Sequence, residues 1–240
     1  MFASTSHQSN NQQSTQWCLP ISRWSIWKVD DLDTSSPNVD FIDANARRKL
    51  SKFAKMGLKV AHDCALEVAQ TRFVFASQHG DLKRATDMLF NLAQNEELSP
   101  TTFSMSVLNA CAGMYSIAKQ DKSPSIAISA GESSFGYGLL EAALQHANHP
   151  ETPVIYVYVD EVPPIICGVN ESPLSHSHAI GLLIANDATA QMMCAISDSK
   201  QVLHAETQSE SFMHSLLNQT NHAWDDGDKR WDWIYSERQH

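Results

Sequence analysis

SPSIAISAGESSFGYGLLEAA, which spans residues 123–143, is the stretch that decides the fold. Its apolar run over 126–130 predicts a buried strand, Gly131 predicts a tight turn, and a helix is expected from Glu132 or Ser133 onward. Enzymes use a strand, a sharp turn and a helix in this order to present a nucleophile. The turn is therefore the first place to look for a functional group.

Working outward, strand and helix patterns alternate up to residue 159. Strands are expected at 17–29 (one or two short ones), 73–77, 126–130, 153–159, 179–185 and 192–196. Helices are expected at 47–69, from 81 or 87 to 94, and at 107–119, 133–147 and 211–217. Asn186 and Asp187 predict a hairpin, Ser99 and Pro100 a loop, and Gly113 the close approach of another backbone. This order predicts an α/β fold with a sheet covered by helices on both faces.

Composition limits the function classes. The 240 residues carry a formal net charge of −10, so nucleic-acid binding through a basic surface is not expected. No apolar run reaches the roughly 18 residues of a membrane span. Residues 1–15 are polar and have no apolar core, which argues against a secretory signal and predicts a disordered tail before a single domain over 16–240.

Cofactor and metal motifs are not apparent. The five cysteines are far apart and form no C-x-x-C pair, so we expect reduced thiols in a cytoplasmic protein, without disulfides or zinc. Neither GxGxxG nor a P-loop occurs, and no cofactor is predicted. His176 and His178 share a face ahead of a strand, but a metal pair would need a third ligand that the sequence does not identify.

Three further segments point to a family. RRKLSKFAKMGLKVA (47–61), FASQHGDLKRATDML (75–89) and LSPTTFSMSVLNACAGMYSIA (98–118) precede the 123–143 stretch in the order seen in the N-terminal half of β-ketoacyl synthases. The amino-acid sequence of these segments resembles that of the ketoacyl-synthase-like proteins of aryl polyene pigment clusters. Those proteins are chain-length-factor-type partners of a full synthase. The resemblance implies a thiolase-like α/β fold, in which helices cover a layered sheet.

Two departures from that family bear on chemistry. The position of the family's nucleophilic cysteine holds Glu132, followed by Ser133 and Ser134. The part of the fold that supplies two catalytic histidines in full synthases is expected to be missing. Condensation needs a thiolate to hold the acyl chain. The resemblance therefore implies a catalytically silent subunit that pairs with a complete ketoacyl synthase in a type II polyketide or fatty-acid-like pathway.

The resemblance also implies contact surfaces. Subunit pairing and the far end of the partner's acyl tunnel are assigned to Phe103, Met105, Leu108, Ala112, Met114, Ile126 and Ile128. Six of the 17 basic residues fall within residues 47–59, and the matching helix of ketoacyl synthases faces the acidic acyl carrier protein. Docking of that carrier is assigned to Arg48, Lys49 and Lys52.

Alternatives remain open at this stage. GESSFG is one residue away from the G-x-S-x-G elbow of hydrolases, and Ser133, Asp160 and His176 or His178 follow the hydrolase order. Glu132 is a candidate acid/base group for a decarboxylase if the elbow partly desolvates it. Otherwise it is a relic, or a hydrogen-bonding plug that fills the old cavity. A homodimeric scaffold without chemistry is the remaining alternative.

Overall fold

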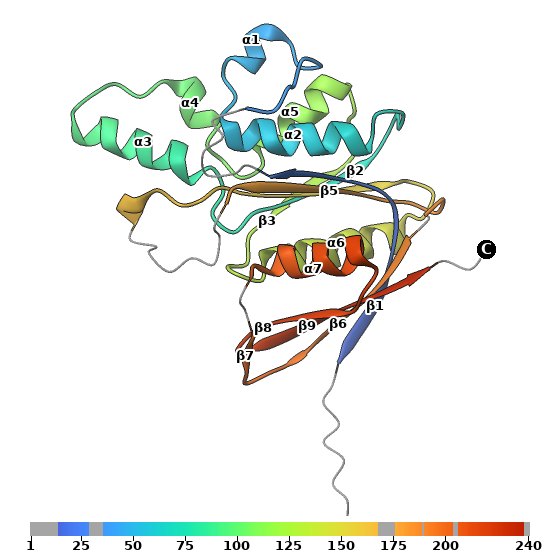
Figure 1. Cartoon of the computed structure of the whole chain (residues 1–240). Coiled ribbons are helices and arrows are strands. Elements are labelled where there is room, and N and C mark those ends of the chain that lie inside the picture. Colours follow the sequence, from blue (N-terminus) through green and yellow to red (C-terminus); the bar gives the residue numbers. More distant parts are fainter. Residues whose placement is uncertain (1–13, 29–35, 168–175, 189, 204–205, 238–240) are drawn as a thin grey trace, which may run out of the picture.

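The computed structural model describes residues 14–28, 36–167, 176–188, 190–203 and 206–237 (Figure 1). The tail expected at residues 1–15 lies outside the described part of the chain, apart from its last two residues. The strands are β1 (Thr15–Lys28), β2 (Arg72–Ala76), β3 (Ser125–Ile128), β4 (Val154–Asp160), β5 (His178–Ile184), β6 (Ala190–Asp198), β7 (Val202–Leu203), β8 (His222–Asp226) and β9 (Lys229–Glu237). The helices are α1 (Ala44–Arg47), α2 (Lys52–Cys64), α3 (Leu82–Ala93), α4 (Pro100–Ser104), α5 (Ala110–Lys119), α6 (Ser134–Asn148) and α7 (Gln208–Asn218), with a 3-10 turn, η1, at Ile165–Cys167.

Hydrogen bonds join the strands into one mixed sheet of order β3-β2-β4-β5-β1-β6-β9-β8-β7. The sheet folds over on itself, so that α6 and α7 lie between its two halves and α2 and α5 cover the outer face of the first half (Figure 1). The first half contains the parallel strands β3, β2 and β4. This layered α/β arrangement is the thiolase-like fold that was expected.

β1 joins the two halves. Residues Thr15–Ile21 pair with β6, and Ile21–Lys28 pair with β5, with a register irregularity between Ile21 and Arg23. Pro20 is paired only on its β6 side. A proline removes one ladder donor, which a strand tolerates where a neighbour is missing. The predicted one or two short strands are therefore one long bent strand.

Two cores follow from this layering. Phe53, Phe75 and Val157 belong to the core between the sheet and α2 and α5. The other core surrounds α6 and α7, and its largest fully buried side chains are Phe135, Tyr156, Phe212, Trp231 and Trp233. β4 contributes to both cores and is buried along its whole length, as its continuously apolar sequence predicted.

Several predicted elements need correction. The expected helix over 47–69 is broken, because the Ser51 side chain accepts a bond from the Ala54 amide and starts α2 there. The Asn186–Asp187 hairpin is wrong: β1 lies between β5 and β6. The loop expected after Ser99 contains α4, capped by the Ser99 hydroxyl. The tryptophan-rich end, to which no element was assigned, forms the hairpin of β8 and β9.

Other predictions are confirmed. β2 and α6 lie close to their expected bounds, and Asp81, the earlier of the two proposed starts, caps α3.

The close approach expected at Gly113 is not found, since a Cβ there would meet nothing within 4 Å. No helix within the described ranges is both long enough and apolar enough to cross a bilayer.

Candidate functional site

The predicted elbow is present between β3 and α6, but its strand is exposed to half-buried and ends at Ile128, so the buried strand expected over 126–130 is wrong. Gly131 has φ +60°, a conformation that L side chains rarely adopt, and it reverses the chain. The buried Ser134 hydroxyl accepts a bond from the Ala130 amide at 2.8 Å and donates to the Gly131 carbonyl at 2.6 Å. Ser134 therefore fixes the turn and is not free to act as a nucleophile.

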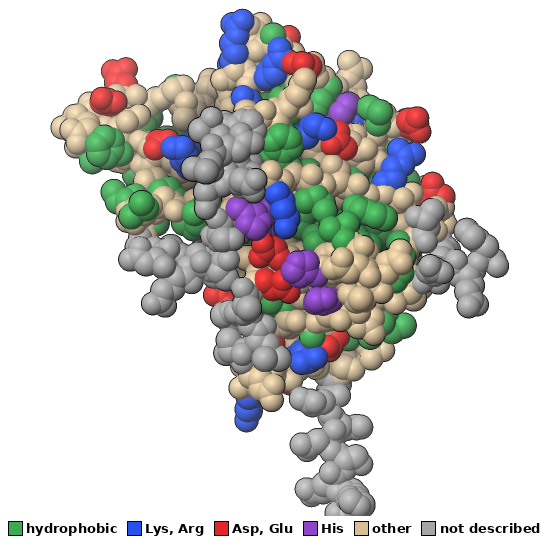
Figure 2. All heavy atoms as spheres, viewed as in Figure 1, with side chains coloured by type: hydrophobic (Ala, Val, Ile, Leu, Met, Phe, Trp, Pro, Cys, Tyr) green, Lys and Arg blue, Asp and Glu red, His purple; other side chains and the backbone are tan. Residues whose placement is uncertain are grey.

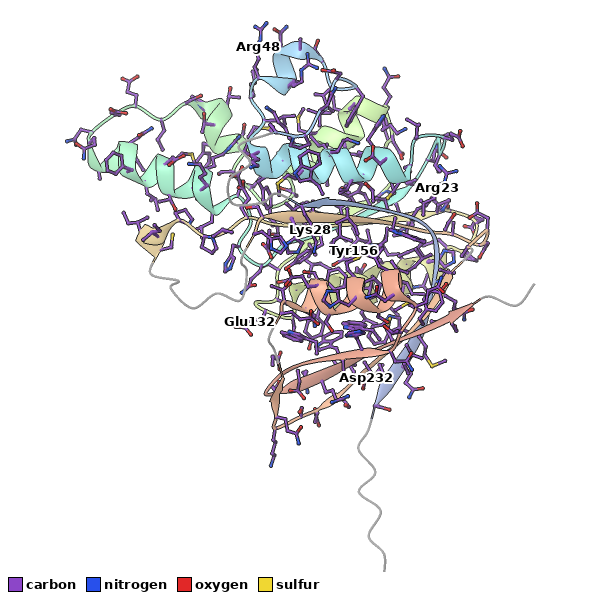
Figure 3. The ribbon with its side chains drawn as sticks, in the orientation of Figure 1. Arg23, Lys28, Arg48, Glu132, Tyr156 and Asp232 are labelled. Atoms are coloured by element: carbon purple, nitrogen blue, oxygen red, sulfur yellow. The ribbon has the colours of Figure 1, made fainter. Side chains whose placement is uncertain are left out.

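Glu132 occupies the tip of the elbow. Its side chain is exposed, and Figure 3 places it at the margin of the molecule beside the start of α6. The partial desolvation expected for an elbow carboxylate is therefore not found in the described structure. The acid/base alternative depended on that desolvation and loses its support.

Ser133 ties the elbow to the turn between β8 and β9. It is buried, and its hydroxyl donates to the Asp226 carboxylate at 2.8 Å. Burial alone would raise the pKa of Asp226. Bonds from the Lys229 and Asp228 amides and from the Ser133 hydroxyl outweigh burial and lower that pKa. Ser133 thus serves as a donor that stabilises a carboxylate.

The other residues of the proposed hydrolase order have different partners. Asp160 accepts bonds from the Ser77 hydroxyl and the Gln78 and His79 amides. His178 is buried and pairs with the Ser209 hydroxyl at 2.8 Å; burial lowers its pKa. These bonds hold the loop after β2 and the start of α7 against the sheet, and His176 lies 3.2 Å from a Glu210 carboxylate oxygen. The described contacts therefore do not assemble a Ser–Asp–His triad.

A groove of about 870 Å³ opens where the starts of α2 and α4 and one side of α3 meet the end of β4. Arg48, Lys49 and Lys52, the three predicted docking residues, all line it. Figure 3 shows Arg48 at the far end of the molecule from Glu132, projecting outward near α1. The groove is thus separate from the elbow.

The groove also contains charged residues that the sequence analysis did not select. Lys83 and Arg84 extend its basic rim, and Asp81, Asp87 and Glu161 add carboxylates. Burial, followed by the charge of Asp81, raises the pKa of Glu161 to about 7 against the opposing effect of Lys52 and Lys83. Asp81 and Arg84 form a largely buried ion pair at 3.1 Å. The sequence could have identified Asp81 and Glu161 by their positions, since Asp81 precedes a predicted helix and Glu161 follows a predicted strand.

The predicted pairing and tunnel residues fall on α4, on the link to α5, on α5 and on β3. Phe103 lies on α4 and is 61% exposed, while Ala112 faces the core from α5 and is 2% exposed. Met105, Leu108 and Met114 pack at the margin of the α2–α5 core. Ile126 and Ile128 belong to β3, the outermost strand of the parallel half.

Comparison with protein families identifies the fold's relatives. Residues 22–234 match the model of the β-ketoacyl synthase N-terminal domain. The chain belongs to the β-ketoacyl synthase N-terminal domain family. A search of curated protein sequences found no significant match.

Solved structures agree with this family. A chain of the ketosynthase ApeO in complex with its chain length factor ApeC, from Xenorhabdus doucetiae, aligns with TM-score 0.76 and 26% identity over 91% of this chain and 99% of that one. The ishigamide ketosynthase/chain length factor aligns with TM-score 0.52 and 13% identity, over 73% and 65% of the two chains. A β-ketoacyl synthase from Burkholderia phymatum aligns with TM-score 0.54 and 12% identity, over 78% and 56%. The last two similarities support the fold alone.

Proposed function

We propose that this protein is a non-catalytic, chain-length-factor-type subunit that pairs with a complete β-ketoacyl synthase. The observation that carries the proposal is the elbow, which is folded but presents the exposed carboxylate of Glu132 at its tip. Condensation holds the growing chain as a thioester on a cysteine thiolate. A carboxylate at this position cannot form that thioester.

The similarity to the ApeO and ApeC complex supports the same role. It extends over nearly the full length of both chains, so the two are of similar size. We therefore assign the protein to the class of aryl polyene or related type II polyketide pathways. The substrates of the partner synthase are then acyl chains delivered on an acyl carrier protein.

β3 is the proposed pairing surface. It ends the sheet order, so one edge of its backbone has no partner strand within the described chain. Such an edge is a template for pairing with another chain. Ile126 on this strand is 39% exposed, and burying it against a partner would add apolar stabilisation.

The neighbouring α4–α5 segment is proposed to close the partner's acyl tunnel. Phe103, Met105 and Leu108 place apolar side chains at or near the surface there. Ala112 and Met114 support the segment from α5. Side-chain volume in this segment would then limit the length of the acyl chain.

The first experiment tests whether the elbow is catalytically inactive. The isolated protein is incubated with acyl thioesters of the carrier protein and of coenzyme A, and its intact mass is measured. We expect no covalent adduct. A stable acyl group on Glu132, Ser133 or Ser134 would show that the elbow is catalytic. Release of CO₂ from a malonyl thioester by the isolated chain would support the decarboxylase alternative.

The second experiment tests pairing. The protein is co-expressed with its cognate synthase, and Ile126→Glu is expected to abolish co-purification because it buries a charge against the partner. Leu217→Glu, at a side chain on α7 that is 52% exposed, is the matched control and should leave the complex intact. Wild-type recovery of the Ile126→Glu complex would contradict the β3 assignment. A stable homodimer that excludes the synthase would support the scaffold alternative.

A further inference from the structure

Three potential metal ligands converge in the C-terminal part of the fold, and none of them belongs to the elbow or lines the groove. Glu206 precedes α7, His214 lies on α7, and His222 begins β8. One ligand atom from each lies within 4.8 Å of the other two. His214 Nδ1 is 2.8 Å from a Glu206 carboxylate oxygen, and the two imidazole rings have centroids 5.6 Å apart.

We propose that Glu206, His214 and His222 form a divalent metal site of the zinc type, completed by water. Two imidazoles and one carboxylate are a ligand set that Zn²⁺ binds in proteins, with bonds of about 2.0–2.2 Å. A tetrahedral ion with such bonds holds its ligand atoms roughly 3.4 Å apart. Closing the set therefore requires the most separated atoms to approach by about 1.4 Å at most, within the reach of side-chain rotation.

The surrounding structure holds these ligands in place. The carbonyl of Glu206 accepts a bond from the indole Nε1 of the buried Trp224 at 3.2 Å. The link from α7 to β8 is short and fixed, since the Thr220 amide donates to the Ser215 carbonyl and the Ser215 hydroxyl donates to the Thr220 carbonyl. His214 and His222 are thus held at a set spacing. Preorganisation of this kind favours binding, because fewer groups lose freedom when the ion arrives.

Charge and accessibility also fit a cation. The protein has a formal net charge of −10, and the site adds one carboxylate to two imidazoles. His214 is exposed and the other two side chains are half-buried, so an ion can reach the site from solvent. A bound ion would cross-link the segment before α7 to α7 and β8. This inference does not depend on the proposed pairing with a synthase.

The test uses the full chain, freed of metal with a chelator, and ZnCl₂ as the probe. Calorimetric titration is expected to show one saturable site, and thermal unfolding should shift upward with added Zn²⁺ because the ion binds the folded state. Co²⁺ in place of Zn²⁺ should give the visible bands of a tetrahedral site. His214→Gln and His222→Gln should each weaken binding by at least about tenfold, as should Glu206→Gln.

His149→Gln, at an exposed histidine outside the cluster, is the matched control and should bind like the wild type. Circular dichroism of each variant shows whether it is folded, and only folded variants are compared. Zn²⁺ affinity that stays at the wild-type value in His214→Gln/His222→Gln would overturn the proposal. So would a wild-type chain with no saturable binding.

Discussion

At the scale of single residues, tight packing around α6 follows from its glycines. A Cβ on Gly136 would lie 2.6 and 2.7 Å from two ring atoms of Trp231, a side chain with no exposed surface. Since neither the ring nor the helix can move without disturbing the core, we expect Gly136→Ala to lower the free energy of unfolding by about 1–3 kcal/mol. Urea titration of the isolated chain measures it.

Gly113→Ala is the matched control for that prediction. It lies on α5, and an added Cβ meets nothing within 4 Å. Alanine is the better helix former by roughly 0.5–1 kcal/mol, so this variant should be as stable as the wild type or more stable. Equal stability of Gly136→Ala and the wild type would mean that α6 and β9 pack less closely than described.

The carboxyl of Glu161 makes stability depend on pH. Burial and the charge of Asp81 raise its pKa from 4.5 to about 7 in the folded state. Below pH 4.5 the group is protonated in both states, and above pH 7 it is ionised in both. The folded state therefore loses stability as the pH rises through this window, because its ionised form is disfavoured there.

Glu161→Gln removes that titration. We expect the variant to be more stable than the wild type at pH 8 by roughly 1–3 kcal/mol and about equal to it at pH 4. Urea unfolding at both pH values measures the difference, and Glu97→Gln, at an exposed loop position, serves as the control. A difference that is the same at pH 4 and pH 8 would show that Glu161 acts through packing and not through its charge.

At the scale of elements, the sequence predicted those helices, strands and turns that the local pattern of residues determines. The run PVIYVYV predicted β4, and Gly131 with the small residues around it predicted the elbow. Ser51 has the residue type of an N-cap, but the apolar spacing through it hid the break between α1 and α2. The place of β1 between β5 and β6 could not be predicted, because that pairing is set by residues at least 150 positions apart.

The candidate site could likewise be predicted only in part from the sequence. Local charge pointed to residues 47–59, and the family resemblance selected Arg48, Lys49 and Lys52, which all line one groove. The contribution of α3 to that groove depends on tertiary packing, which brings Arg84 to within 2.9 Å of the Lys49 carbonyl. The link from Ser133 to Asp226 joins residues 93 positions apart and left no signal in the sequence.

The α4–α5 segment carries a prediction about product length. Phe103 is exposed in the isolated chain, so Phe103→Ala should leave the fold intact and, if this segment closes the tunnel, lengthen the product of the assembled complex. Mass spectrometry of the released chains measures the change. The reverse substitution, Ala112→Phe, is unsuitable as a test, because Ala112 is 2% exposed and a phenyl ring there would overpack the core. An unchanged product from an intact Phe103→Ala complex would place the tunnel elsewhere.

At the scale of the whole molecule, charge is unevenly distributed. The protein is acidic overall, yet Lys and Arg side chains gather near α1, at the end of the molecule where Arg48 projects (Figures 2 and 3). Arg48, Lys49 and Lys52 face the groove beside the carboxylates of Asp87 and Glu161. An acidic carrier protein would be attracted to this rim and repelled by much of the remaining surface. Such an arrangement acts mainly on the rate of encounter and is screened by salt.

Arg48→Glu/Lys49→Glu tests that attraction in the complex with the synthase. We expect slower condensation at low ionic strength, and a deficit that shrinks as salt is added, because the Debye length falls from about 30 Å at 0.01 M to 10 Å at 0.1 M. Arg23→Glu/Lys28→Glu on β1, outside the groove, is the matched control. Steady-state rates at two salt concentrations, with gel filtration of each complex, separate the outcomes. If the variant complex condenses at the wild-type rate at both salt concentrations, the basic rim is only a solvated surface. Loss of the complex would place the basic rim in the subunit interface.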